Sequence, residues 1–204
     1  MSLVIGYMGD SFQIWCCDGL TIQPQGDSFV PSSQAVKKIH RLPSINVLCG
    51  WVGEKYDAEM ILDGLSSRQA DSVMLLVKHA ANECQRINRL SHSFCTDRNQ
   101  VFCPTGLLVG GFLMDECFLA SISPEGGVQS KTRFAAIGAG AHSAAKCLRE
   151  VSTHPLSLRD AWTALIDSVV QASHNSEFVG GYLFTFLITR RGIAELPIVE
   201  LGEP

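Results

Sequence analysis

The second residue of the chain, Ser2, offers two groups that a hydrolytic nucleophile needs. Serine is small enough that an initiator methionine is normally removed before it. Removal of Met1 would leave Ser2 with both a hydroxyl and a free α-amine. The unperturbed pKa of such an amine, ~7.7–8, suits a general base at neutral pH. The amine can take the hydroxyl proton directly or through one water, so one residue would supply nucleophile and base.

Two charged residues, Asp18 and Lys38, lie at the margins of strands predicted in the first half of the chain. If the first two strands form a hairpin, Asp18 returns beside the start of the chain. A charge at a buried sheet edge has to be paired. A nearby Lys38 ammonium would lower both pKa values of Ser2, and Asp18 would keep that lysine charged and oriented. Taken singly, Asp18 also fits a turn and Lys38 a solvated strand.

The eight cysteines are scattered, mostly within apolar runs, and no Cys-x-x-Cys occurs. The six histidines form no zinc-ligand pattern with them. We therefore expect reduced cysteines that serve as small core residues, with no metal and no cofactor. Cys16, Cys17 and Cys49 are alternative nucleophiles, but they lie in apolar strands and no local motif places a histidine beside them.

The candidate residues are positioned by a regular succession of predicted elements. An opening hairpin (3–9 and 11–17) precedes a turn-rich stretch (21–33) and a second strand pair (36–41 and 45–49, joined by Leu42-Pro43-Ser44). Two helices follow, one near 56–65 and one with an apolar stripe from Ala70 to Ile87. Four strands are then expected at 105–114, 116–122, 128–133 and 134–137. The last elements are two helices, which begin after Gly140 and Ser157, and strands at 182–189 and 193–199. Two antiparallel sheets, each covered on its outer face by a helix pair, would bury all the apolar stripes. We predict an α+β fold, a four-layer αββα sandwich.

Composition narrows the class of protein. The chain has 204 residues, 46% hydrophobic and 18% charged, which excludes a disordered protein. No linker, repeat or composition shift divides it, so one domain over 1–204 is expected.

The net charge of −4 and the absence of a basic stripe argue against nucleic-acid binding. No apolar run reaches the ~18 residues of a membrane helix, and the start has no basic region, so no signal peptide is expected. With the cysteine usage, this predicts a cytoplasmic protein.

Several motifs resemble the proteasome-type N-terminal-nucleophile hydrolases, which include proteasome β subunits and the bacterial HslV-type peptidase. With Ser2 counted as first, Asp18 is seventeenth, where the family carries its acidic residue, and Asp18-Gly19 is similar to the HslV-type Asp-Gly pair. Residues 37–42 (Lys-Lys-Ile-His-Arg-Leu) resemble the family strand Lys-Ile-x-Arg-Leu, and 47–53 (Val-Leu-Cys-Gly-Trp-Val-Gly) resemble Val-Leu-Ala-Gly-x-x-Gly. Later landmarks match in order: 107–111, 123–127, 136–140 and Gly180-Gly181.

The resemblance implies the αββα sandwich and endopeptidase activity inside a barrel of stacked rings. It makes Ser2 the nucleophile and base, Lys38 the residue that tunes its pKa, Asp18 the partner of that lysine, and the Gly50 N–H the oxyanion donor. It also implies self-association into rings, a peptide or unfolded-protein substrate, and an ATPase unfoldase as partner. No cofactor or metal is implied.

Three departures from the family pattern leave the function open. The family nucleophile is usually threonine, and the serine of its Gly-Ser-Gly is Ala139 here. An Asp and a Ser that precede the Gly-Gly in proteasome β subunits are replaced by Ser176 and Val179. Three functions therefore remain: a threonine-type peptidase with Ser2 as nucleophile, a non-catalytic structural subunit of the same kind of ring, and a small-amide amidohydrolase of the wider N-terminal-nucleophile class.

Overall fold

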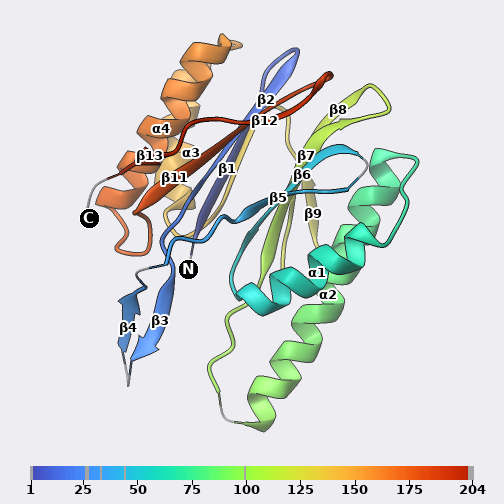
Figure 1. The fold of residues 1–204 in the computed structure, drawn as a ribbon, viewed down its shortest axis with the longest axis vertical. Helices are drawn as coiled ribbons and strands as arrows, with labels where there is room; N and C mark the ends of the chain where they lie inside the picture. The colour runs from blue at the N-terminus through green and yellow to red at the C-terminus, as the bar shows by residue number, and fades with distance from the viewer. Residues whose placement is uncertain (1, 26–27, 33, 44, 99, 202–204) are drawn as a thin grey trace.

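The computed structural model describes residues 2–25, 28–32, 34–43, 45–98 and 100–201. Two antiparallel sheets lie face to face between two pairs of helices (Figure 1). The first sheet has the order β10-β1-β2-β11-β12, and β13 also pairs with β11. Its strands are β1 (Leu3–Met8), β2 (Phe12–Asp18), β10 (Phe134–Gly138), β11 (Tyr182–Thr189), β12 (Gly192–Glu195) and β13 (Val199–Glu200).

The second sheet has the order β5-β6-β7-β8-β9. Its strands are β5 (Ile39–Arg41), β6 (Asn46–Val52), β7 (Gly106–Leu113), β8 (Glu116–Ile122) and β9 (Val128–Ser130). The helices are α1 (Lys55–Ser66), α2 (Val73–Asp97), α3 (Ala141–Val151) and α4 (Leu158–His174). A separate two-stranded ribbon consists of β3 (Ile22–Gln25) and β4 (Ser28–Pro31).

Three apolar clusters hold the layers together, which gives the predicted αββα sandwich. The inner cluster joins the two sheets and includes Val4, Trp15, Leu48 and Leu108. A second cluster packs α3 and α4 on the first sheet, and a third packs α1 and α2 on the second sheet. Because both faces of each sheet are covered, its central strands read as continuous apolar runs rather than alternating ones. The predicted fold class is confirmed.

Several boundaries differ from the sequence expectations. The stretch expected to be only turn-rich forms the β3–β4 ribbon, and the strand expected at 36–41 is reduced to β5. The single strand expected at 193–199 is divided into β12 and β13, with Pro197 between them. Proline lacks the N–H that a ladder requires. The predicted connection through Ser44 and the predicted removal of Met1 concern residues outside the described part of the chain.

The helix starting after Ser157 confirms its predicted cap. The Asp160 N–H donates to Ser157 Oγ at 3.2 Å, and the Ser157 hydroxyl donates to Asp160 Oδ2 at 2.7 Å. Such a cap satisfies N–H groups that have no partner in the first turn. Within the residues described, no helix combines the length and apolar character needed to cross a membrane.

Candidate active site

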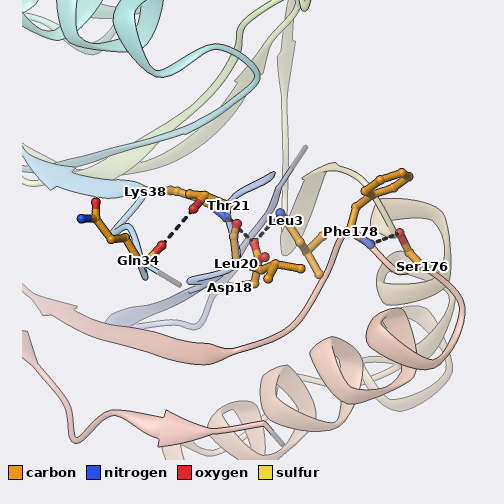
Figure 2. A network of polar contacts seen from close by, with 8 residues as sticks. All are labelled: Leu3, Asp18, Leu20, Thr21, Gln34, Lys38, Ser176 and Phe178. Carbon is orange, nitrogen blue, oxygen red and sulfur yellow. Dashed lines mark hydrogen bonds and ion pairs between the residues drawn. The ribbon is translucent and has the colours of Figure 1, made fainter. Parts of the chain in front are cut away.

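The buried pair Asp18 and Lys38 is the centre of the candidate site. Asp18 ends β2, and Lys38 immediately precedes β5 in the opposite sheet. Both side chains are fully buried, and Lys38 Nζ lies 3.0 Å from Asp18 Oδ1. Lys38 Nζ also donates to the Leu20 carbonyl at 2.5 Å. Figure 2 shows Lys38 reaching the loop that follows β2, where its charge is neutralised by Asp18.

The same carboxylate also holds the start of the chain. The Leu3 N–H donates to Asp18 Oδ1 at 2.7 Å, so one oxygen of Asp18 receives both the Lys38 ammonium and the amide after Ser2 (Figure 2). The structure therefore places Asp18 in contact with the residue that follows Ser2, and Lys38 in contact with Asp18. The sequence alone gave no signal for the Leu3 N–H or the Leu20 carbonyl, because backbone groups carry no residue identity.

The electrostatics of Asp18 reflect two opposing effects. Burial raises the pKa of the Asp18 carboxyl, while the Lys38 charge and the Leu3 N–H act to lower it. Asp18 Oδ2 is buried and has no hydrogen-bond partner among the described groups. The Lys38 charge thus favours the ionised form of the Asp18 carboxyl and opposes the effect of burial on its pKa.

Ser2 is held through the peptide unit that joins it to Leu3. Its carbonyl accepts the Ala139 N–H at 2.8 Å, and the following N–H is held by Asp18. The residue is only 3% exposed. These contacts fix the position and direction of the first described residue, which a preorganised nucleophile requires.

The loop after β2 and the loop before β11 enclose the Asp18–Lys38 pair. The Gly19 N–H donates to the Tyr182 carbonyl at 2.6 Å, and the Leu20 N–H donates to the Gly180 carbonyl at 3.2 Å. The Gly180-Gly181 landmark therefore lies against the residues that receive Lys38. The Val36 N–H donates to the Gly19 carbonyl at 3.0 Å, which holds the approach to Lys38 in place.

Gly138, the first glycine of the predicted Gly-x-Gly landmark, allows β10 to approach Ser2. Its φ is +95°, in the region that favours glycine. An added Cβ would lie 1.9 Å from the Ser2 carbonyl oxygen and 2.7 Å from Val52 Cγ1. No other residue type fits here without moving the backbone of Ser2.

We expect Gly138→Ala to lower both stability and any activity of Ser2. The positive φ alone costs about 1–3 kcal/mol, and the clash with Ser2 adds to it. Gly192→Ala is the matched control, since Gly192 also has positive φ (+147°) but an added Cβ would meet nothing within 4 Å. Denaturant unfolding of the two variants measures the difference. Equal losses in both would show that the approach to Ser2 is not what Gly138 serves.

Gly50 lies in the middle of β6, between Ile39 of β5 and Leu108 of β7. Its neighbour Trp51 donates its N–H to the Lys38 carbonyl at 2.9 Å, toward β5. Because successive residues of an antiparallel strand direct their N–H groups to opposite sides, the Gly50 N–H faces β7. The glycine has a packing role here, since an added Cβ would lie 2.6 Å from Val4 Cγ1. The predicted oxyanion role of Gly50 stays a prediction.

A pocket of about 490 Å³ is lined by Val52 and Gly138, and Gly138 closely approaches the Ser2 carbonyl. Its walls come from the ends of β6 to β10 and the start of α3. The polar lining side chains are neutral: Ser121, Ser123 and Gln129. This pocket suits an uncharged group.

The alternative thiol nucleophiles are not activated. Burial raises the pKa of Cys17 and of Cys49 to about 12, and that of Cys16 well above its ordinary value. These thiols are protonated at neutral pH and enclosed in the core. All eight cysteines are free.

The described residues contain no group of three or more His, Cys, Asp or Glu that could hold a metal ion.

Two of the three departures from the family pattern, at Ala139 and at the Ser176 and Val179 positions, can be placed in the structure. Ala139 contributes its N–H to Ser2 but no hydroxyl. The Ser176 hydroxyl accepts the Phe178 N–H at 3.4 Å within its own loop (Figure 2). Val179 is fully buried in the apolar cluster under α3 and α4. Ser176 thus serves the structure of its loop, and Val179 serves the core.

Comparison with protein families identifies the chain. Residues 3–183 match the family model described as Proteasome subunit. The chain belongs to the proteasome subunit family. Comparison with individual curated proteins gives no significant match. The matched range contains the Asp18–Lys38 pair, Gly50 and Gly138, and excludes Ser2. Proteasome subunits assemble into rings, and the family supports a role as a proteasome-like subunit without deciding between a catalytic and a structural one.

Proposed function

We propose that this proteasome-family subunit is an endopeptidase that uses Ser2, exposed by removal of Met1, as its nucleophile. The observation that supports this most strongly is the single oxygen of Asp18 that receives both Lys38 Nζ and the Leu3 N–H. A fully buried lysine beside the start of the chain is costly unless it is paired. Its position is explained if its charge acts on the groups of Ser2.

The first half of the reaction forms an ester between Ser2 and the substrate. The α-amine of Ser2 takes the hydroxyl proton as Oγ attacks the peptide carbonyl carbon. The resulting ammonium then gives this proton to the leaving nitrogen, and the C–N bond breaks. Lys38 favours the deprotonated states of both groups through its positive charge, and Asp18 keeps that charge in place.

The second half restores the enzyme. A water attacks the ester carbonyl while the α-amine accepts one of its protons. The C–O bond to Ser2 then breaks, Oγ recovers a proton, and the carboxylic acid product leaves. A backbone N–H directed at the carbonyl oxygen would stabilise the negative charge in both steps, worth about 10²–10³ in rate. We assign this role to Gly50, which requires its N–H to leave the ladder with β7.

The neutral pocket beside Val52 and Gly138 supports a preference for peptides with an uncharged residue next to the scissile bond. Ring assembly would restrict access of folded proteins to such a site. A cytoplasmic location and an ATPase unfoldase that feeds the ring are further parts of this proposal.

Intact mass measurement and an active-site electrophile test the proposal. We expect the mature protein to lack Met1 and an epoxyketone, which bridges an amine and a hydroxyl, to add one equivalent at Ser2. Ser2→Ala lacks the hydroxyl and is the control that should remain unmodified. Full retention of Met1, or no adduct on a protein that has lost Met1, would contradict a catalytic role.

Ala139 favours a second function, a non-catalytic subunit of a proteasome-like ring. Where the family carries a serine hydroxyl near the terminal amine, this chain offers only a methyl group. A structural subunit has no need of that hydroxyl and tolerates a retained Met1. Ring assembly with an unmodified, methionine-bearing terminus would support this second function.

A further inference from the structure

Thr105 is a fully buried threonine that the proposed chemistry does not use, and it immediately precedes β7. The last pair of the β6–β7 ladder joins Val52 to Gly106. Beyond this pair, the Thr105 hydroxyl accepts the Glu54 N–H at 3.1 Å and donates to the Glu54 carbonyl at 3.3 Å. One side chain thus continues the pairing of the two segments after the main-chain ladder has ended.

Asn88 of α2 fixes the backbone of Thr105. Asn88 Oδ1 accepts the Thr105 N–H at 2.8 Å, and Asn88 Nδ2 donates to the Thr105 carbonyl at 2.9 Å. Asn88 Nδ2 also donates to the Cys84 carbonyl at 2.8 Å, and the Cys84 thiol donates to the Thr105 carbonyl at 3.3 Å. All three residues are buried. Because a buried polar group is costly when it loses its partner, these bonds fix the direction in which the Thr105 side chain leaves the backbone.

The two segments that Thr105 joins form one wall of the neutral pocket of about 490 Å³. Val52, Pro104 and Gly106 line the pocket. Thr105, between the last two, directs its hydroxyl back to the other segment. Gly53 has a φ of +108°, and an added Cβ would lie 2.3 Å from the Pro104 carbonyl oxygen. The backbones of the two segments are therefore in direct contact behind the pocket.

The same wall contacts a neighbour of Ser2. A Cβ added to Gly138 would lie 2.7 Å from Val52 Cγ1 and 1.9 Å from the Ser2 carbonyl oxygen. The Val52 side chain and the Ser2 carbonyl thus both lie against Gly138. A shift of Val52 would change the shape of the pocket and the packing around Gly138 together.

We propose that Thr105 is a positioning residue of this peptidase, which holds residues 52–54 in place so that the pocket accepts an uncharged substrate side chain. The inference rests on the proposed function and adds to it a residue that acts through Val52 rather than by contact with the reacting atoms. Since Thr105 fixes a wall of the pocket, its hydroxyl should matter most for substrates whose side chain reaches that wall.

Thr105→Val and Thr185→Val test this inference as a matched pair. Both threonines are fully buried, and valine has a similar shape. Thr185 Oγ1 has no hydrogen-bond partner in the part of the chain that the structure describes. The measurement is kcat/KM of the assembled protein for peptides with leucine or alanine next to the scissile bond. We expect Thr105→Val to lose about tenfold or more with the leucine peptide and less than about threefold with the alanine peptide. Thr185→Val should keep the wild-type values for both.

Two milder variants show whether the hydroxyl itself is responsible. Thr105→Ser keeps the hydroxyl and should restore the wild-type ratio between the two peptides. Thr105→Cys keeps only a weak acceptor, so it should give an intermediate ratio, and it replaces Thr105→Val if that variant fails to assemble. A ratio in Thr105→Ser as low as in Thr105→Val would contradict the role of the hydroxyl.

Amide hydrogen exchange tests the wall without any substrate. Exchange of residues 52–56 should be faster in Thr105→Val than in Thr185→Val, because the Glu54 N–H loses its acceptor. Equal exchange in the two variants, or an equal loss with both peptides, would overturn the role of Thr105 and leave the proposed function intact. An assembled wild-type protein that hydrolyses neither peptide would contradict the proposed function itself, and this inference with it.

Discussion

Ser2→Ala abolishes peptide hydrolysis, by a factor on the order of 10⁴–10⁶, if Ser2 is the nucleophile. Alanine keeps the α-amine and a small side chain before which Met1 is removed, but it lacks the oxygen that forms the ester. The backbone contacts of Ser2 involve its carbonyl and the Leu3 N–H, which alanine preserves. The unfolding midpoint and the assembly state should therefore match the wild type.

Ser2→Thr is the matched control for this experiment. Threonine retains both the hydroxyl and the α-amine, so hydrolysis should persist while Ser2→Ala is inactive. Fluorogenic peptides measure the rate, and intact mass verifies that each variant has lost Met1. Wild-type turnover by Ser2→Ala would eliminate the nucleophile assigned here. Absence of turnover in all three proteins, with assembled rings, would instead support the structural subunit.

Lys38→Met removes hydrolysis and also destabilises the protein at neutral pH. The substitution keeps the length of the side chain but leaves the buried Asp18 carboxylate without its counter-charge. Breaking a buried ion pair in this way costs about 3–5 kcal/mol. Lys37→Met is the matched control, because Lys37 is a neighbouring lysine whose ion pair with Glu195 is exposed. An exposed pair contributes only ~0–1 kcal/mol.

The loss in Lys38→Met should depend on pH with a definite sign. Burial raises the pKa of Asp18 above its unfolded value, and loss of the Lys38 charge removes an effect that lowers it. A carboxyl with a raised pKa in the folded state destabilises that state as pH rises through the folded pKa. Unfolding of Lys38→Met in denaturant should therefore require more denaturant at pH 5 than at pH 7. A deficit that is independent of pH would contradict the role of Asp18.

The double variant Asp18→Asn/Lys38→Met separates stability from catalysis. Both charges are then absent, and the asparagine oxygen can still accept the Leu3 N–H. We expect most of the stability lost in Lys38→Met to return, because a buried pair can often be replaced by neutral groups at little cost. Hydrolysis should stay absent, since no cation remains to act on Ser2. Recovery of activity together with stability would show that the pair has only a structural function.

The sequence was sufficient for the parts of this protein that follow from local pattern. Apolar runs and turn residues predicted both sheets and all four helices, and Ser157 predicted the cap of α4. The order of motifs indicated the family that the comparison then established. The β3–β4 ribbon was missed because its prolines are typical of turns.

The sequence by itself determined the layered fold and the identities of Ser2, Asp18 and Lys38 as residues capable of the chemistry. The tertiary structure alone decided that one oxygen of Asp18 receives both Lys38 and the Leu3 N–H, and that Gly50 directs its N–H toward β7. Sequence spacing fixes the period of a strand, but the approach of two sheets and the direction of each backbone group follow from packing between residues far apart in the chain. That is the physical reason why the charged pair could be predicted as a hypothesis, whereas its geometry required the folded molecule.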